Sequence, residues 1–245
     1  MKGKVYLVGA GPGDYKLLTL KGLECIKKAD VIVYDRLANK NYLKEAKENC
    51  EFIYVGKASS NHTLPQDDIN RVIADKAKEG KIVTRLKGGD PYVFGRGGEE
   101  GELLKEEGIE FEVVPGITSA IGGLCYAGIP ITHRDYASSF HVITGHLRDD
   151  DKENPEINWN ALANTNGTLV FLMGVANLQK ISSNLIKEGK SKDTPVALIS
   201  WATRSNQRVI TSTLENVYET AVRENVKPPT LIAVGDVVEL SLIHI

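Results

Sequence analysis

A glycine-rich stretch, residues 86–100 (LKGGDPYVFGRGGEE), places one acid and one base among five glycines. Glycine adopts positive φ readily and lets a ligand approach the backbone without meeting a Cβ. Ordering such a loop costs conformational entropy, and a connector usually needs only about two to six residues. The stretch is therefore typical of a functional loop, in which Asp90 and Arg96 are candidate polar groups. The simpler interpretation is a long turn that only joins a strand to a helix.

A second glycine turn, residues 9–14 (GAGPGD), follows an apolar run at 4–8 and precedes a helix for which Thr19 is a candidate cap. Strand, glycine turn and helix outline a nucleotide-binding unit. The dinucleotide fingerprint G-x-G-x-x-G is absent, and Pro12 removes a backbone donor that a pyrophosphate would use. We therefore expect a ligand that needs close backbone approach but no phosphate cradle. A nicotinamide oxidoreductase is the alternative from a different class.

Polar residues follow three predicted strands. Asp35 follows the run at 31–34, Lys57 follows 51–55, and Asp90 follows 81–86. The carboxyl ends of the strands form the ligand-binding edge of an open α/β sheet. Asp35 and Lys57 are therefore candidate site residues. The alternatives are that Asp35 only caps the next turn and that Lys57 is an ordinary surface lysine.

Strands and helices alternate along the whole chain, which predicts an α/β fold of two domains. Pro115-Gly116 marks the boundary between the predicted domains, residues 1–114 and 115–245. In the second half we expect strands near 140–143, 168–172, 195–200, 207–212 and 231–234, and helices near 117–127, 177–188 and 215–224. Asn177 is expected to cap the second of these helices, and Gly189 to end it.

Composition excludes several classes of protein. The net charge of −2 over 245 residues gives no basic excess for bulk nucleic-acid binding. No apolar run approaches the ~18–20 residues of a membrane helix, and no signal peptide is recognised, so we expect a cytoplasmic protein. Cys25, Cys50 and Cys125 lack metal or redox spacing and should be reduced, mostly buried thiols. The histidines show no metal-binding spacing, and His141 fits a core position.

Several long segments, in the same order, resemble the tetrapyrrole methylase family. The resemblance extends from about residue 4 to 240, and the 86–100 loop is its most specific part. The segments that carry it are VYLVGAGPGD at 5–14 with LLT at 17–19, YDRL at 34–37, VGK at 55–57, residues 86–100, VPGITSA at 114–120, GIPITHR at 128–134 and FLMG at 171–174. Tyr15 and Ala58 depart from the usual family pattern, and Ala58 leaves the substrate-side charge in question.

The resemblance implies two α/β domains with the active-site cleft between them. It implies S-adenosylmethionine as methyl donor, leaving S-adenosylhomocysteine, and no metal. It also implies two successive C-methylations of uroporphyrinogen III, giving precorrin-2 for sirohaem or cobalamin biosynthesis. The N-terminal domain would lie on the substrate side and the C-terminal domain would complete the donor site. The family is dimeric, so a homodimer is expected, with no nucleic-acid or membrane partner.

The resemblance also assigns site residues. The implied proton acceptor is Asp35 and the implied proton donor is Lys57. The positions carried over as cofactor-binding are Pro12, Gly88, Gly89, Asp90, Val93, Thr118, Ser119, Met173, Ala202 and Ala233. Thr118 and Ser119 are equally well interpreted as helix caps.

The implied substrate carries eight carboxylates, so positive groups must gather locally in a protein of net charge −2. The candidates for binding it include Arg36, Lys87, Arg96 and Arg134. Within the family, the alternatives are a methylase of a later corrin intermediate and a methylase of a diphthamide precursor. A tetrapyrrole carrier without activity is the alternative as a binding module.

Overall fold

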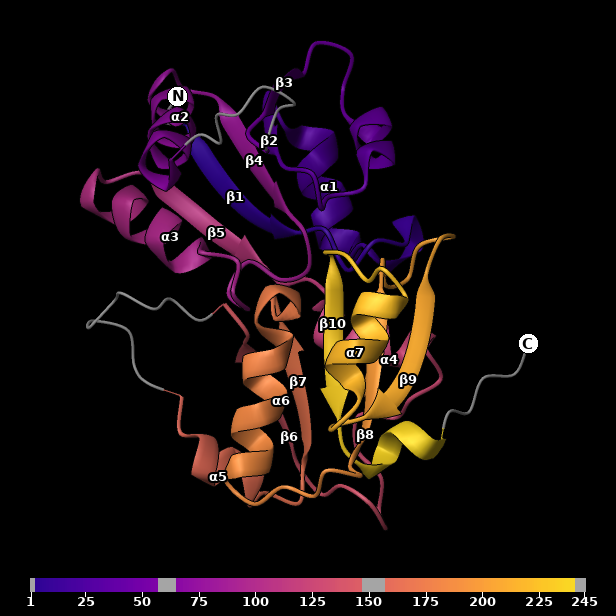
Figure 1. Ribbon diagram of the computed structural model, residues 1–245. Helices are drawn as coiled ribbons and strands as arrows, with labels where there is room; N and C mark the ends of the chain where they lie inside the picture. The colour runs from indigo at the N-terminus through magenta and orange to yellow at the C-terminus, as the bar shows by residue number, and fades with distance from the viewer. Residues whose placement is uncertain (1–2, 57–64, 147–156, 241–245) are drawn as a thin grey trace. The chain divides into compact units, whose positions relative to one another are not determined.

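The computed structural model describes residues 3–56, 65–146 and 157–240 (Figure 1). The chain divides into two compact units, Met1–Thr118 and Ser119–Ile245, each built on its own five-stranded sheet. The α/β fold class is therefore confirmed. The division falls shortly after the boundary expected at residue 114, and the separate roles assigned to the two domains stay a prediction.

The sheet of the first unit is parallel, with the strand order β3-β2-β4-β1-β5. Its strands are β1 (Lys4–Gly9), β2 (Val31–Tyr34), β3 (Glu51–Tyr54), β4 (Ile82–Lys87) and β5 (Glu110–Val114). Its helices are α1 (Leu20–Lys28), α2 (Gln66–Lys78) and α3 (Gly97–Glu106), with short 3-10 helices at Tyr15–Leu17 and Lys40–Glu45.

Helices cover both faces of this sheet. On one face, Ile26 of α1 and Tyr42 pack with Ile32 of β2. On the other face, α2 and α3 pack against the alternate strand residues, with Ile73 beside Val33. Helix α1, which follows β1, thus lies on one face of the sheet, and helix α3, which follows β4, lies on the other. The adjacent carboxyl ends of β1 and β4 form a topological switch point, which is where open α/β sheets bind ligands.

Local signals in the sequence define the helix ends. Thr19 caps α1 as predicted, because its Oγ1 accepts a hydrogen bond from the backbone N–H of Gly22 at 3.0 Å. Gly80 ends α2 with a φ of 83°. Gly189 ends the helix α6 (Leu178–Lys187) of the second unit with a φ of 105°.

The second unit has a mixed sheet with the strand order β6-β7-β10-β8-β9. Its strands are β6 (Phe140–Thr144), β7 (Thr168–Leu172), β8 (Pro195–Ser200), β9 (Arg208–Thr213) and β10 (Thr230–Val234). Strands β6 and β7 are parallel, and the other neighbouring pairs are antiparallel. The helices are α4 (Ser119–Tyr126), α5 (Trp159–Ala163), α6 and α7 (Val217–Arg223), with short 3-10 helices at Val175–Asn177 and Asp236–Leu240.

Two apolar clusters hold the second unit together. Leu124 of α4 packs with Leu231 of β10 on one side, and Ile181 of α6 packs with Val217 of α7 and Ile232 of β10 on the other. Strand β10 is buried at all five positions, which explains its continuous apolar sequence.

One expectation needs correction. The Asn177 side chain does not cap α6; its Nδ2 donates to the Gly145 carbonyl at 2.8 Å and so ties the start of the helix to the chain after β6. The cysteines are free and mostly buried, as expected: Cys25 and Cys50 are buried, and Cys125 is exposed, because Ala120 and Leu124 form the buried face of α4.

His141 is half-buried, and its Nε2 lies 3.2 Å from Thr165 Oγ1. None of the helices in the described ranges is long and apolar enough to cross a membrane.

Candidate active site

The two glycine turns meet at the switch point of the first unit. Gly11 and Gly89 exchange backbone hydrogen bonds, Gly11 N to Gly89 O at 3.1 Å and Gly89 N to Gly11 O at 2.7 Å. Both residues have left-handed backbones, with φ of 72° and 70°. Glycine adopts this conformation without steric strain, so the sequence allows the two loops to join directly.

A third loop, after β5, packs against the joined pair. A Cβ built on Gly116 would lie 2.3 Å from Gly89 O and 2.7 Å from the Gly9 carbonyl carbon. A Cβ on Gly9 would lie 2.5 Å from Gly116 N. Three backbone segments therefore lie at a spacing that only glycine permits, and the edge of the sheet presents backbone groups rather than side chains.

Asp90 holds this arrangement in place. Its Oδ1 accepts the Tyr92 backbone N–H at 2.8 Å, and its Oδ2 accepts the Gly116 N–H at 3.0 Å. Both carboxylate oxygens thus bind backbone groups of the loops that follow β4 and β5. Asp90 thus fixes the shape of the glycine-rich loop through both of its carboxylate oxygens. Its expected role was to contact the methyl donor directly.

The other expected donor residues of the first unit lie close to these loops. Pro12 follows Gly11 directly and is half-buried. A Cβ on Gly88 would lie 2.5 Å from Leu37 Cβ, so a glycine is required there too. The Thr118 Cα lies 3.8 Å from the Cβ position of Gly89. Val93 is half-buried farther along the same loop.

Asp35 lies just beyond the carboxyl end of β2, and 26% of its side chain is exposed. Its Oδ1 accepts the Leu37 backbone N–H at 2.9 Å, so the turn-capping interpretation is correct for one oxygen. Its Oδ2 pairs with Arg85 Nη2 at 3.1 Å. An oriented, partly exposed carboxylate at the ligand-binding edge is suited to accept a proton.

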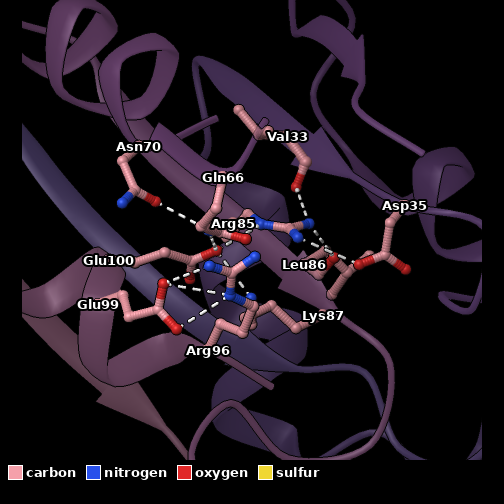
Figure 2. A network of polar contacts seen from close by, with 10 residues as sticks. All are labelled: Val33, Asp35, Gln66, Asn70, Arg85, Leu86, Lys87, Arg96, Glu99 and Glu100. Atoms are coloured by element: carbon pink, nitrogen blue, oxygen red, sulfur yellow. Dashed lines mark hydrogen bonds and ion pairs between the residues drawn. The ribbon is translucent and has the colours of Figure 1, made fainter. Parts of the chain in front are cut away.

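Behind Asp35 lies a buried ion network that the sequence did not predict. Figure 2 shows Arg85 lying between Asp35 and Glu100, with Lys87 on the same strand. Glu100 Oε1 accepts from Arg85 Nε at 3.2 Å, from Lys87 Nζ at 2.7 Å and from Gln66 Nε2 at 3.3 Å. Burial, and then the neighbouring Arg85, lower the pKa of Lys87.

Lys87 is therefore not available to the carboxylates of a substrate, which corrects the expectation for that residue. Only 5% of its side chain is exposed, and its ammonium group is paired with Glu100. The signal in the sequence was the spacing of Arg85 and Lys87, two basic residues on the same face of an otherwise apolar strand. Nothing in the sequence indicated their partner, Glu100, because that pairing depends on how α3 packs over the strand.

The arginines proposed for substrate binding differ in their surroundings. Arg96 is paired with Glu99 through Nε to Oε1 at 2.9 Å and Nη2 to Oε2 at 2.6 Å, and this pairing lowers the pKa of Glu99. Arg36 is exposed and directly follows Asp35. Arg134 is exposed in the second unit, in a turn bridged by His133 and Ala137.

Two of the residues expected to bind the methyl donor, Met173 and Ala202, lie together in the second unit. Met173, after β7, and Ala202, after β8, lie at the same edge of the sheet, because both strands run antiparallel to β10. The backbone there is strained, with positive φ at Met173 (59°) and on both sides of Ala202. Such outliers gather at functional sites, and 53% of Met173 is exposed.

Ser119 and Ala233 complete the expected set. Ser119 is the first residue of α4 and is half-buried. Ala233 is the fourth residue of β10 and is fully buried, paired with β7 on one side and β8 on the other. It belongs to the same apolar cluster as Ala202.

Lys57, the expected proton donor, lies outside the described residues. Among the residues that the structure does describe, no group of three or more His, Cys, Asp or Glu side chains could hold a metal ion.

The fold of the two units and the joined glycine loops can be compared with those of known proteins. The family model of the tetrapyrrole (corrin/porphyrin) methylases matches residues 4–218. The chain belongs to this family, which confirms the resemblance seen in the sequence.

Individual relatives match nearly the whole chain. The chain is 53% identical to the uroporphyrinogen-III C-methyltransferase of Priestia megaterium, over 98% of this chain and 100% of that protein. It is 55% identical to the S-adenosyl-L-methionine-dependent uroporphyrinogen III methyltransferase of Methanosarcina barkeri, over 97% and 93%. A solved structure, the Thermus thermophilus uroporphyrin-III C-methyltransferase complexed with S-adenosylhomocysteine, is 39% identical with a TM-score of 0.81, over 97% and 94%.

Proposed function

We propose that this protein transfers methyl groups from S-adenosylmethionine to ring carbons of uroporphyrinogen III, twice in succession, and so produces precorrin-2. The observation that carries the proposal is an identity above 50%, over nearly the full chain, to methyltransferases that act on this substrate. The joined glycine loops at the switch point support it, because they present a backbone surface that a ligand can approach closely.

The donor's methyl group is already activated by its sulfonium, so the protein's main task is alignment. In-line attack requires the accepting carbon to lie about 3–3.5 Å from the methyl carbon. In the first unit we assign donor binding to the backbone around Pro12, Gly88 and Gly89 and to Thr118. In the second unit the positions that the family resemblance carries over are Ser119, Met173 and Ala202. Asp90 acts in this site by fixing the glycine-rich loop.

We assign proton transfer to Asp35 and Lys57. Methylation of a ring carbon leaves a cationic ring system, which a lost proton neutralises. Asp35 accepts this proton, directly or through water, from the position in which Arg85 and the Leu37 N–H hold its two oxygens. Lys57 donates a proton or binds a carboxylate of the substrate.

The substrate's carboxylates require local positive charge, because the net charge of the protein is −2. Arg36 and Arg134 are exposed and suited to bidentate pairing with a carboxylate. Arg96 pairs with Glu99 through Nε and Nη2, so a substrate carboxylate competes with Glu99 for these two nitrogens. We place the enzyme in the cytoplasm as a homodimer, on family resemblance, and light scattering of the purified protein would test the dimer.

Anaerobic incubation with methyl-labelled S-adenosylmethionine, offered with uroporphyrinogen III or with a later corrin intermediate, tests the reaction. We expect the label to appear in the product when uroporphyrinogen III is the acceptor, and not when the later corrin intermediate is. Label only in the later intermediate would contradict the substrate. A calorimetric titration with NADH tests the oxidoreductase alternative, and we expect no heat of binding.

A further inference from the structure

Glu100 is the most deeply buried member of the ion network. Its side chain is fully buried, and among the described residues Oε1 accepts three hydrogen bonds, from Arg85, Lys87 and Gln66. Oε2 is buried without a hydrogen-bond partner among the described residues. A buried ion network of this kind is weak support for stability, because apolar residues of similar size usually serve as well. Its presence needs another explanation.

The network connects the interior to the candidate site. Arg85 contacts the two carboxylates with different nitrogens, Nε on Glu100 and Nη2 on Asp35, and its Nη1 donates to the Leu86 carbonyl at 3.1 Å. The side chains of Arg85 and Lys87 are 4% and 5% exposed, whereas that of Asp35 is 26% exposed. Asp35 is thus the end of the network that reaches the ligand-binding edge (Figure 2).

The charges balance only when Glu100 is included. Arg85 and Lys87 bring two buried positive charges, and Asp35 and Glu100 bring two negative ones. Without Glu100, Asp35 would be the only carboxylate of this network left to pair with the two cations, and Arg85 and Lys87 would have no counter-charge on the interior side. The lowered pKa of Lys87 agrees with this crowding, because burial and Arg85 oppose its charge while Glu100 supports it.

We propose that Glu100 is a positioning residue that orients Arg85 and offsets the charge of Lys87, so that Asp35 stays placed to accept the proton. This inference rests on the proposed function, in which Asp35 is the proton acceptor. Glu100 itself lies in the interior and acts through Arg85.

The test compares variants in the anaerobic methyl-transfer assay, with kcat and the KM for S-adenosylmethionine measured separately. Glu100→Gln keeps the shape and removes the charge. The double variant Lys87→Met with Glu100→Gln restores the charge balance. Glu102→Gln, the same change at an exposed position of α3, is the matched control. Thermal melting and calorimetric binding of S-adenosylhomocysteine verify that each variant is folded.

We expect Glu100→Gln to lower kcat by about 10- to 100-fold, as a small misplacement near the reacting groups does, with the donor KM changed by less than about twofold. The double variant should recover about tenfold of this loss, and Glu102→Gln should stay within about twofold of wild type. A kcat for Glu100→Gln within about twofold of wild type, or a double variant as slow as the single, would overturn the proposal.

If Glu100→Gln does not fold, Glu100→Asp replaces it, because it keeps the charge and shortens the reach toward Arg85 by one methylene. A lowered kcat in this variant supports the proposal, and an unchanged kcat overturns it. The activity of the wild-type enzyme distinguishes failure of the proposed function from failure of the role assigned to Glu100. No methyl transfer by wild type would contradict the proposed function, whereas transfer that is insensitive to Glu100 would contradict only this role.

Discussion

The backbone N–H of Gly116 donates to Asp90 Oδ2 at 3.0 Å, which ties the loop after β5 to the glycine-rich loop after β4. The second carboxylate oxygen of Asp90 turns the glycine-rich loop itself, by accepting the Tyr92 N–H. One side chain therefore fixes two of the three loops that form the proposed donor site.

Asp90→Ala should weaken binding of S-adenosylhomocysteine by about 10-fold or more, because the loops lose two hydrogen bonds to a charged group, each worth about 1.5–3 kcal/mol. Isothermal titration calorimetry measures this directly. Asp75→Ala, at an exposed position of α2, is the control and should bind like wild type. Unchanged affinity in Asp90→Ala would mean that the loops keep their shape without this carboxylate.

Gly116→Ala should destabilise the first unit by about 1–3 kcal/mol, because the new Cβ would overlap the Gly89 carbonyl oxygen at 2.3 Å. Gly98→Ala is the matched control, since nothing lies within 4 Å of the Cβ it would add. It should be neutral or slightly stabilising, because alanine favours the helix α3. Denaturant melts compare the two, and equal stability would show that the close packing at Gly116 is not required.

Asp30 provides a prediction about pH. Its pairing with Lys47, and then its hydrogen bond from the Ile82 N–H at 2.7 Å, lower its pKa in the folded protein. Its contribution to stability is therefore present above the unfolded pKa of about 3.9 and is lost as the pH falls through the lower folded value.

Asp30→Asn should thus reduce the free energy of unfolding by about 1 kcal/mol at neutral pH, and by progressively less below about pH 4. Urea melts across this range measure the effect. Asp193→Asn, at an exposed position in the second unit, should change stability little at either pH. A loss for Asp30→Asn that grows as the pH falls would contradict the assignment.

The three cysteines should differ in reactivity. Burial raises the pKa of Cys25 and of Cys50, which reduces their thiolate fraction, whereas Cys125 is exposed. Brief treatment of the folded protein with iodoacetamide at neutral pH should therefore add one label, at Cys125, and denaturant should release the other two. Peptide mass mapping locates the label. Modification of Cys25 at a rate equal to that of Cys125 would contradict the packing of α1 against the sheet.

Most elements of the fold could be predicted from the sequence, because their signals are local. The apolar runs at 31–34, 168–172 and 195–200 are strands with the expected bounds, since a buried strand needs only a short continuous apolar segment. The five-residue helix α5 was missed, because so short a helix gives almost no periodic pattern.

The positions of the candidate site residues in the fold could be predicted only in part. Asp35 could be placed because every parallel strand ends at the same edge of its sheet. The pairing of Arg85 and Lys87 with Glu100 could not, because it depends on how α3 packs over β4. For the same reason Lys87 was assigned to the substrate although it faces the interior. Asn177 was assigned to a cap although its side chain bonds to Gly145, because that contact depends on how α6 packs beside the end of β6.

The most direct test of the account is a time course of the anaerobic reaction with uroporphyrinogen III and methyl-labelled S-adenosylmethionine, followed by mass analysis of the tetrapyrrole. We expect a transient product with one added methyl group and a final product with two. Asp35→Asn and Lys57→Met should slow its formation while S-adenosylhomocysteine still binds. A tetrapyrrole that gains no methyl group from an enzyme that binds the donor would contradict the account.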